Sequence, residues 1–188
     1  MESFTENLNT FASIGTIAGH VFILAVLVTW LFARFGKNSP SGKWGREVLA
    51  KIGSYGLALG FLVALASVII SLVYSDIIGY EPCKFCWIQR IFLYPQVIIL
   101  GLALWKKTKD AITYCLALSF IGTPIAAYLF YGQSFNPNAL PACGVTGETS
   151  CAVRYFVEFG YITIPLMSLT AFILIIVSLL LAKSAEKN

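Results

Sequence analysis

Four of the five cysteines in this 188-residue chain form two pairs, each in a polar stretch between apolar runs. The first pair is the C-x-x-C of Cys83 and Cys86; in the second pair, seven residues separate Cys143 from Cys151. A C-x-x-C pair can be half of a zinc site, a structural disulfide or a redox-active dithiol. Disulfides exchange by attack of a thiolate, so two neighbouring pairs can pass electrons without a metal. We therefore interpret both pairs as redox-active, with a structural staple as the alternative for the second.

The residues around the C-x-x-C favour a reactive thiolate beside an electron acceptor. A helix that begins near Cys83 directs the positive end of its dipole at the thiols, and Lys84 adds a positive charge. Arg90 follows Cys86 by four residues, which places it one turn deeper on the same helix face. An arginine at the edge of a membrane span either extends to the lipid headgroups or serves a functional site. In the second case its guanidinium can hydrogen-bond a carbonyl group beside the cysteine sulfur, and a quinone carries such groups.

The composition indicates an integral membrane protein. Of the residues, 58% are apolar and 12% are charged, against about 25% charged in an average soluble domain, which excludes a disordered chain and disfavours a soluble globule. The net charge of +4 comes from basic residues spread too thinly to form a nucleic-acid-binding face. A membrane span needs about 20 apolar residues of helix. The candidate spans are residues 11–33, 53–75, 91–105 extended by the preceding turn through Arg90, 111–131 and 159–182.

The predicted fold class is therefore an all-α integral membrane protein with five spans. Its basic residues fix the orientation, since short loops rich in Lys and Arg remain in the cytoplasm. Ten of the thirteen basic residues fall in the segments on one side of the predicted membrane. Only Lys84, Arg90 and Arg154 fall in the segments on the other side. We expect the N-terminus and both cysteine loops outside and the C-terminus in the cytoplasm. The first span lacks the basic start and the short apolar stretch of a secretory signal, so we expect it to be retained.

Two further residues of chemical interest lie within spans. Cys115 is in the fourth span, where a buried cysteine behaves as a small apolar residue, and we expect no redox role for it. His20 is a titratable group in the first span. We expect its ring to hydrogen-bond a neighbouring helix rather than bind a ligand.

Two sequence motifs are similar to one family of membrane proteins. Residues 83–90, C-K-F-C-W-I-Q-R, precede F-L-Y-P at 92–95, and the loop of the second pair precedes F-G-Y-I-T-I-P at 159–165. In these motifs the chain resembles the disulfide bond formation protein B family (DsbB), and most closely its BdbC-type branch, over roughly residues 53–182. The resemblance implies a four-helix transmembrane bundle in the bacterial inner membrane. Its implied activity is quinone-dependent oxidation of an extracytoplasmic, thioredoxin-like (DsbA-like) dithiol oxidase.

The resemblance also implies a role for each cysteine of the two pairs. The partner's thiolate would attack a disulfide between Cys143 and Cys151, at Cys143, to give a mixed disulfide. The thiols that result would reduce a disulfide between Cys83 and Cys86, and Cys86 would pass the electrons to ubiquinone or menaquinone. This route needs no metal. The residues implied to bind the quinone are Cys86, Gln89 and Arg90.

The same resemblance divides the chain into three parts. Residues 1–52 form an additional N-terminal transmembrane helix and a basic cytoplasmic loop, residues 53–182 form the redox bundle, and residues 183–188 form a cytoplasmic tail. The family pattern gives the additional helix no role. We consider that it shields the bundle or binds another subunit.

Three alternatives remain open from the sequence. A vitamin K epoxide reductase-like enzyme has similar chemistry, but there the loop pair precedes the quinone-side C-x-x-C, and here the order is reversed. Four thiolates can also bind a soft metal ion in a membrane transporter or assembly factor. A structural membrane protein with stapled loops is the third alternative, and it leaves Arg90 unexplained.

Overall fold

The computed structural model describes residues 2–36, 40–140 and 150–185. Most of these residues are helical, because the apolar runs can satisfy their backbone hydrogen bonds inside a membrane only as helices. An isolated bridge between Glu158 and Ile162 is the extended pairing in the described part of the chain. The elements are α1 (Glu2–Phe35), α2 (Pro40–Ser54), α3 (Gly56–Leu72), the π-helical turn η1 (Val73–Ile77), α4 (Lys84–Lys106), α5 (Ala111–Ser134), the 3-10 turn η2 (Pro137–Ala139) and α6 (Ile164–Ala185).

Five of these helices are long and apolar enough to cross a membrane, which confirms the predicted number of spans. They are α1, α3 with η1, α4, α5 and α6. The third span begins at Lys84, so the turn through Arg90 does belong to it.

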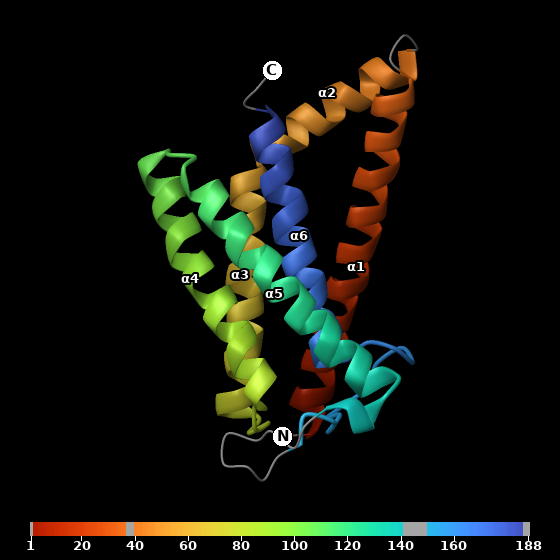
Figure 1. The fold of residues 1–188 in the computed structure, drawn as a ribbon, viewed down its shortest axis with the longest axis vertical. Coiled ribbons are helices and arrows are strands. Elements are labelled where there is room, and N and C mark those ends of the chain that lie inside the picture. The colour runs from red at the N-terminus through yellow and green to blue at the C-terminus, as the bar shows by residue number, and fades with distance from the viewer. Residues whose placement is uncertain (1, 37–39, 141–149, 186–188) are drawn as a thin grey trace.

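The basic segment between the first two spans is a helix rather than the predicted loop. This helix, α2, runs across the end of the molecule between α1 and α6 (Figure 1). Its glycines allow close packing: a side chain at Gly45 would press against Ala33 of α1, and one at Gly53 would collide with Leu181 of α6. Contacts with two other helices therefore outweigh the low helix propensity of glycine.

The helices α3, α4, α5 and α6 form a four-helix bundle in which each packs on the next around a closed ring. A single apolar core fills this ring, and Cys115 belongs to it as a fully buried free thiol, in agreement with its predicted behaviour as a small apolar residue. The helix α1 stands outside the ring and packs on α2 and α6 (Figure 1). The largest fully buried side chains of the core are Leu100, Phe172, Ile175 and Leu179.

Both described cysteine segments lie at the same end of the molecule. The start of α1, the connection that carries Cys83 and the segment that carries Cys151 are together at the lower end of Figure 1. We call this the cysteine end. The helix α2, the α4–α5 connection and the end of α6 lie at the opposite end (Figure 1). The start of α1 and the end of α6 are therefore at opposite ends of the bundle, as an odd number of spans requires.

Candidate active site

The C-x-x-C pair is placed at the start of α4. Cys83 is the N-cap residue, with extended backbone dihedrals, and Cys86 lies in the first turn. Both are free thiols, and their Sγ atoms are 3.4 Å apart, which is a hydrogen-bonding distance for sulfur rather than a covalent bond. The Cys83 side chain is only 5% exposed. The pair is therefore a closely packed dithiol at a helix N-terminus.

The pKa of the Cys83 thiol is lowered from 9.0 to about 7. The largest cause is the hydrogen bond that the thiol of Cys86 donates to it, and backbone N–H groups of the first turn of α4 act in the same direction, while burial opposes them. The causes predicted from the sequence were the helix end and the nearby basic residues. The structure gives the larger part to the neighbouring thiol.

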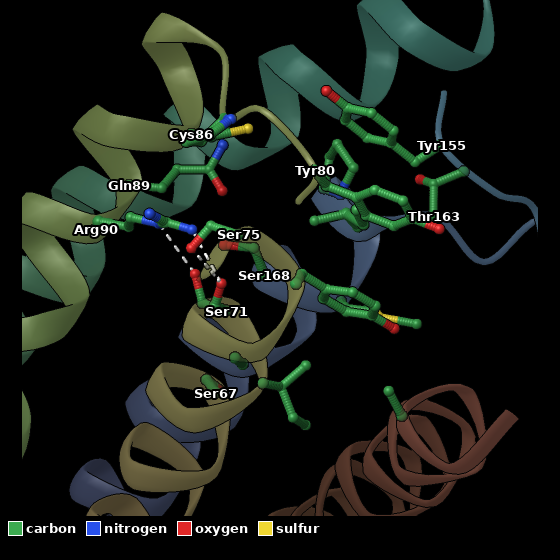
Figure 2. Close-up of a pocket in the computed structure, with 18 of the residues that line it drawn as sticks. Ser67, Ser71, Ser75, Tyr80, Cys86, Gln89, Arg90, Tyr155, Thr163 and Ser168 are labelled. Carbon is green, nitrogen blue, oxygen red and sulfur yellow. Dashed lines mark hydrogen bonds between the residues drawn. The ribbon is translucent and has the colours of Figure 1, made fainter. Parts of the chain in front are cut away.

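The guanidinium of Arg90 is turned toward α3 (Figure 2). Its Nε donates to the hydroxyl of Ser71 at 3.0 Å, and its terminal nitrogen donates to the Ser71 carbonyl at 2.9 Å. It also lies 5.1 Å from the ring of Trp87 and 5.9 Å from that of Tyr94, within the range of cation–π attraction. Arg90 is thus held by side chains inside the span instead of extending to the headgroups.

Gln89 carries a buried polar group that lacks a partner. Its side chain lies between Cys86 and Arg90 in Figure 2, and it is 6% exposed. The amide nitrogen has no hydrogen-bond partner among the described residues, and neither does the buried hydroxyl of Thr163. An unmade buried hydrogen bond costs about 1–3 kcal/mol, so an acceptor that reached these two open donors would be bound favourably.

These side chains line one cavity of about 400 Å³. Its walls come from α1, α3, α4 and α6 and from both described cysteine segments. Most lining residues are apolar, and the volume is within the usual range for a small-molecule site, about 300–1,000 Å³. We call it the cysteine-lined cavity. Its lining includes the polar or reactive side chains of Cys83, Cys86, Gln89, Arg90, Cys151 and Thr163.

The second cysteine pair is described only at Cys151. This residue is disulfide-bonded and 1% exposed, and Cys143 lies outside the described residues. Cys151 packs in one buried cluster with Cys83, Leu129 and Leu140, and Cys86 packs against that cluster. The structure therefore brings the predicted C-x-x-C and one member of the second pair together.

Gln133 of α5 holds the Cys151 segment in place. Its amide nitrogen donates to the carbonyl of Cys151 at 2.8 Å and to that of Val153 at 3.1 Å. Arg154 in turn donates to the backbone carbonyl of Gln133. A segment without regular structure is thereby fixed to a transmembrane helix.

An aromatic contact joins the two cysteine segments. Tyr155 stacks on Tyr80 with ring centroids 4.3 Å apart, and its hydroxyl donates to the carbonyl of Glu81 at 2.7 Å. The pKa of Tyr155 is raised, chiefly by burial, so the hydroxyl stays protonated and keeps its role as donor. This contact connects the residue before Pro82 with the segment that follows Cys151.

The predicted site did not include Ser71, Gln133 or Thr163. One signal was available for the first: Ser67, Ser71 and Ser75 recur every four residues in an apolar run, which places them on one helix face. All three line the cavity. The other two gave no such pattern.

The described residues contain no cluster of three or more histidine, cysteine or acidic side chains able to hold a metal ion. The four-thiolate hypothesis also requires Cys143, outside the described ranges. Cys151 is disulfide-bonded here and so offers no thiolate.

A helical bundle in the membrane that packs a dithiol and a disulfide-bonded cysteine around one apolar cavity defines a membrane thiol–disulfide oxidoreductase. A sequence model for the family "Disulfide bond formation protein DsbB" matches residues 54–182, and the chain belongs to this family. The resemblance seen in the C-x-x-C-x-x-Q-R motif is confirmed. The family is one of disulfide-forming membrane proteins, and the chain is accordingly a membrane thiol oxidase that acts with a thiol–disulfide partner.

Curated relatives carry names of the same kind. "Probable disulfide formation protein C" of Halalkalibacterium halodurans is 40% identical over 128 residues, which is 66% of this chain and 91% of the relative. "Probable disulfide formation protein C 2" of Bacillus anthracis is 34% identical, covering 68% of this chain and 90% of the relative. "Probable disulfide formation protein" of Chlamydia pneumoniae is 35% identical, covering 70% and 94%. No solved structure matches the chain. The family match covers α3 to α6 and leaves α1 and almost all of α2 outside it.

Proposed function

We propose that this protein oxidises an extracytoplasmic, thioredoxin-like dithiol protein and passes the electrons to a membrane quinone. The observation that carries the proposal is the cysteine-lined cavity. Cys83, Cys86 and Cys151 share this one space with the guanidinium of Arg90 and the unpartnered amide of Gln89. In this proposal, residues 53–182 act as the redox bundle.

The proposed exchange conserves two electrons and two protons. The partner's thiolate attacks the disulfide of the second pair, Cys143 and Cys151, and the partner's other thiol resolves the mixed disulfide, which leaves the partner oxidised and the second pair reduced. A thiolate of the second pair then attacks a disulfide between Cys83 and Cys86. The second pair returns to the disulfide, and the C-x-x-C becomes a dithiol.

Two features of the described residues support this internal exchange. Cys83 and Cys151 pack in the same buried cluster, so their segments are already adjacent. A free dithiol at the C-x-x-C together with a disulfide-bonded Cys151 is the combination of oxidation states that follows the exchange.

The residues of the cavity fit a quinone. The buried donors of Gln89 and Thr163 lack acceptors, and a quinone ring offers carbonyl oxygens at both ends with apolar edges between them. Arg90 has five N–H groups, and its two bonds to Ser71 leave others for a ligand. Ubiquinone and menaquinone both meet these requirements. When bound, such a ring supplies the acceptor for two electrons and two protons.

The chain's own residues prepare the dithiol for oxidation. The lowered pKa of Cys83 favours the thiolate form of its sulfur near neutral pH, and the thiol of Cys86 donates its proton toward that sulfur. Arg90, one turn deeper than Cys86, places a positive charge beside the pair. Its contacts with Ser71 keep the charge at this depth.

We also propose the orientation and location given by the basic residues. The cysteine end holds three of the thirteen basic residues of the chain, and the other ten belong to the opposite side. The cysteine end then faces outward from the inner membrane of a bacterium, and the C-terminus is cytoplasmic. An extracytoplasmic dithiol partner reaches the second pair from that side.

The test is turnover by the purified protein. Reduced thioredoxin-like partner and a quinone are mixed with the protein in detergent, and loss of partner thiols and reduction of the quinone are followed together. We expect equal molar amounts of partner disulfide and quinol, and no turnover in Cys86→Ser. Cys115→Ala is the matched control and should retain turnover, because Cys115 lies in the core away from the cavity. Full turnover by Cys86→Ser would exclude the proposed route.

A further inference from the structure

We infer that α1, the helix outside the family match, forms a wall of the cysteine-lined cavity and binds the isoprenoid chain of the quinone. This inference rests on the proposed function and extends it. It gives the additional N-terminal helix a role in selecting the acceptor.

One face of α1 lines the cavity. The residues Phe11, Ala12, Gly15 and Thr16 contribute to its wall, and their spacing of one, three and four positions places them on one side of the helix. The helix packs on α6, while the cavity lies between it and α3 (Figure 2). This part of the cavity is therefore a slot with α1, α3 and α6 as its sides.

The slot extends from the polar site toward the middle of the membrane. On α3, Val63 lines the cavity eight residues before Ser71, which is about 12 Å deeper at 1.5 Å per residue. On α6, Leu174 lines it ten residues after Ile164, about 15 Å deeper. The cavity thus has a polar end beside Arg90 and an elongated remainder directed into the apolar layer.

The slot offers apolar contact and almost no free hydrogen-bond donors. The hydroxyl of Thr16 donates to the carbonyl of Ala12 at 2.9 Å, and that of Ser67 donates to the carbonyl of Val63 at 2.7 Å. No charged side chain from α1, α3 or α6 lines the cavity in the described part of these helices. A hydrocarbon chain attached to a ring at the polar end matches this distribution.

Two contacts fix α1 against the walls on either side of its lining turn. The buried amide oxygen of Asn9 accepts a hydrogen bond from the hydroxyl of Tyr74 at 2.9 Å. His20 is hydrogen-bonded to the hydroxyl of Thr170 on α6 at 2.9 Å, which confirms the expectation that its ring pairs with a neighbouring helix. Asn9 and His20 flank residues 11–16, so the lining turn is held at both ends.

Gly15 provides a direct test of the wall. It lines the cavity, and a side chain added there meets nothing within 4 Å. The series Gly15→Ala, Gly15→Leu and Gly15→Phe therefore starts from an unobstructed Cβ and adds side-chain volume at the cavity wall in steps. The matched control is Ile14→Phe, because Ile14 is 55% exposed and does not line the cavity.

The probes are a menaquinone with a short isoprenoid chain and menadione, which has the same ring and no chain. Ubiquinone with a short chain and the chainless ubiquinone ring form a second pair of probes. The dissociation constant of each is measured by quenching of tryptophan fluorescence, and KM is measured in the turnover assay. We expect Gly15→Phe to weaken binding of the chain-bearing quinones by about tenfold or more, equal to about 1.4 kcal/mol. Binding of the chainless rings should stay within about twofold, and Ile14→Phe should resemble the wild type with all probes.

The outcomes separate this inference from the proposed function. Unchanged binding of all probes by Gly15→Phe overturns the role of α1 and leaves the proposed function intact. Equal weakening of chain-bearing and chainless probes also overturns it, because α1 would then act on the ring. If the wild type binds and reduces none of the four quinones, the proposed function fails and this inference fails with it.

Discussion

The low pKa of Cys83 can be tested by removing the hydrogen bond that is its largest cause. Cys86→Ala removes the donor, whereas Cys86→Ser replaces the thiol with a hydroxyl that can still donate. Both changes are made in a background in which Cys115, Cys143 and Cys151 are alanine, so Cys83 is the one thiol left. We expect the pKa of Cys83 to rise from about 7 toward 9.0 in the alanine variant and to stay well below 9.0 in the serine variant.

The size of the effect on reactivity follows from these values. A thiol with a pKa of about 7 is half ionised at pH 7, and one with a pKa of 9.0 is about 1% ionised, a difference of about 50-fold. Intrinsic nucleophilicity changes in the opposite sense, with a Brønsted coefficient of about 0.4–0.5, which amounts to about six- to tenfold over two pKa units. At pH 7, Cys83 in the alanine variant, with a pKa of 9.0, should therefore react about five- to eightfold more slowly than a Cys83 whose pKa stays at about 7.

The sign of the effect should reverse at high pH. Lowering of the Cys83 pKa means that its thiolate forms as the pH rises through about 7 and is lost as the pH falls below it. Above pH 9.0 the sulfur is ionised in both variants, and the more basic thiolate of Cys86→Ala should react about six- to tenfold faster.

Two measurements check this prediction. Ultraviolet absorbance of the thiolate gives the pKa by titration, and the rate of reaction with methyl methanethiosulfonate gives the reactivity at each pH. Alanine and serine are of similar size, so the ratio of the two rates isolates the sulfur of Cys83. Coincident titration midpoints in the alanine and serine variants would refute the assignment to the Cys86 donor. The kinetic argument would be refuted if the same variant reacted faster at every pH from 6 to 10.

Three further changes test other parts of the site and fold. Arg90→Lys loses the planar fork that makes two hydrogen bonds to Ser71, so the KM for quinone should rise by about tenfold in steady-state turnover, while single-turnover oxidation of the partner without quinone changes by less than about twofold. Gln133→Leu leaves two backbone carbonyls without their donor, so thermal unfolding should show a loss of about 2–4 kcal/mol and the segment after Cys151 should be cut faster by protease. Gly122→Ala presses a methyl group into a buried aromatic ring of α6, so denaturant titration in micelles should show a loss of about 1–3 kcal/mol; an unchanged midpoint would contradict the described packing.

The number of spans and the shared end of the cysteine segments could be predicted from the sequence. The thickness of the membrane core imposes a minimum length on each apolar run, and a chain with 12% charged residues leaves few ways to place the boundaries. The position of Arg90 at the edge of a span follows from the same argument. Membrane physics therefore determined the coarse fold before any tertiary contact was considered.

The structure added what depends on rotation and packing between helices. Ser71 and Arg90 are 19 residues apart on different helices, and their hydrogen bonds require a relative rotation of α3 and α4 that no local pattern encodes. The helix α2 was missed because its glycines indicate a loop when only local propensity is considered. Gln133 was missed because its partners are backbone carbonyls of an irregular segment, which carry no sequence signal.

The position of α1 has a consequence for how the protein can be linked to its partner. Because α1 adds one crossing to an even-numbered bundle, its N-terminal end lies at the cysteine end, whereas α6 ends on the opposite side (Figure 1). A soluble dithiol domain fused ahead of α1 by a short flexible linker would reach the second cysteine pair at an effective concentration in the millimolar range. The same domain fused after α6 would be separated from that pair by the full thickness of the bundle. Fusion ahead of α1 is therefore the arrangement in which tethering can replace diffusion in the encounter between a dithiol domain and this membrane enzyme.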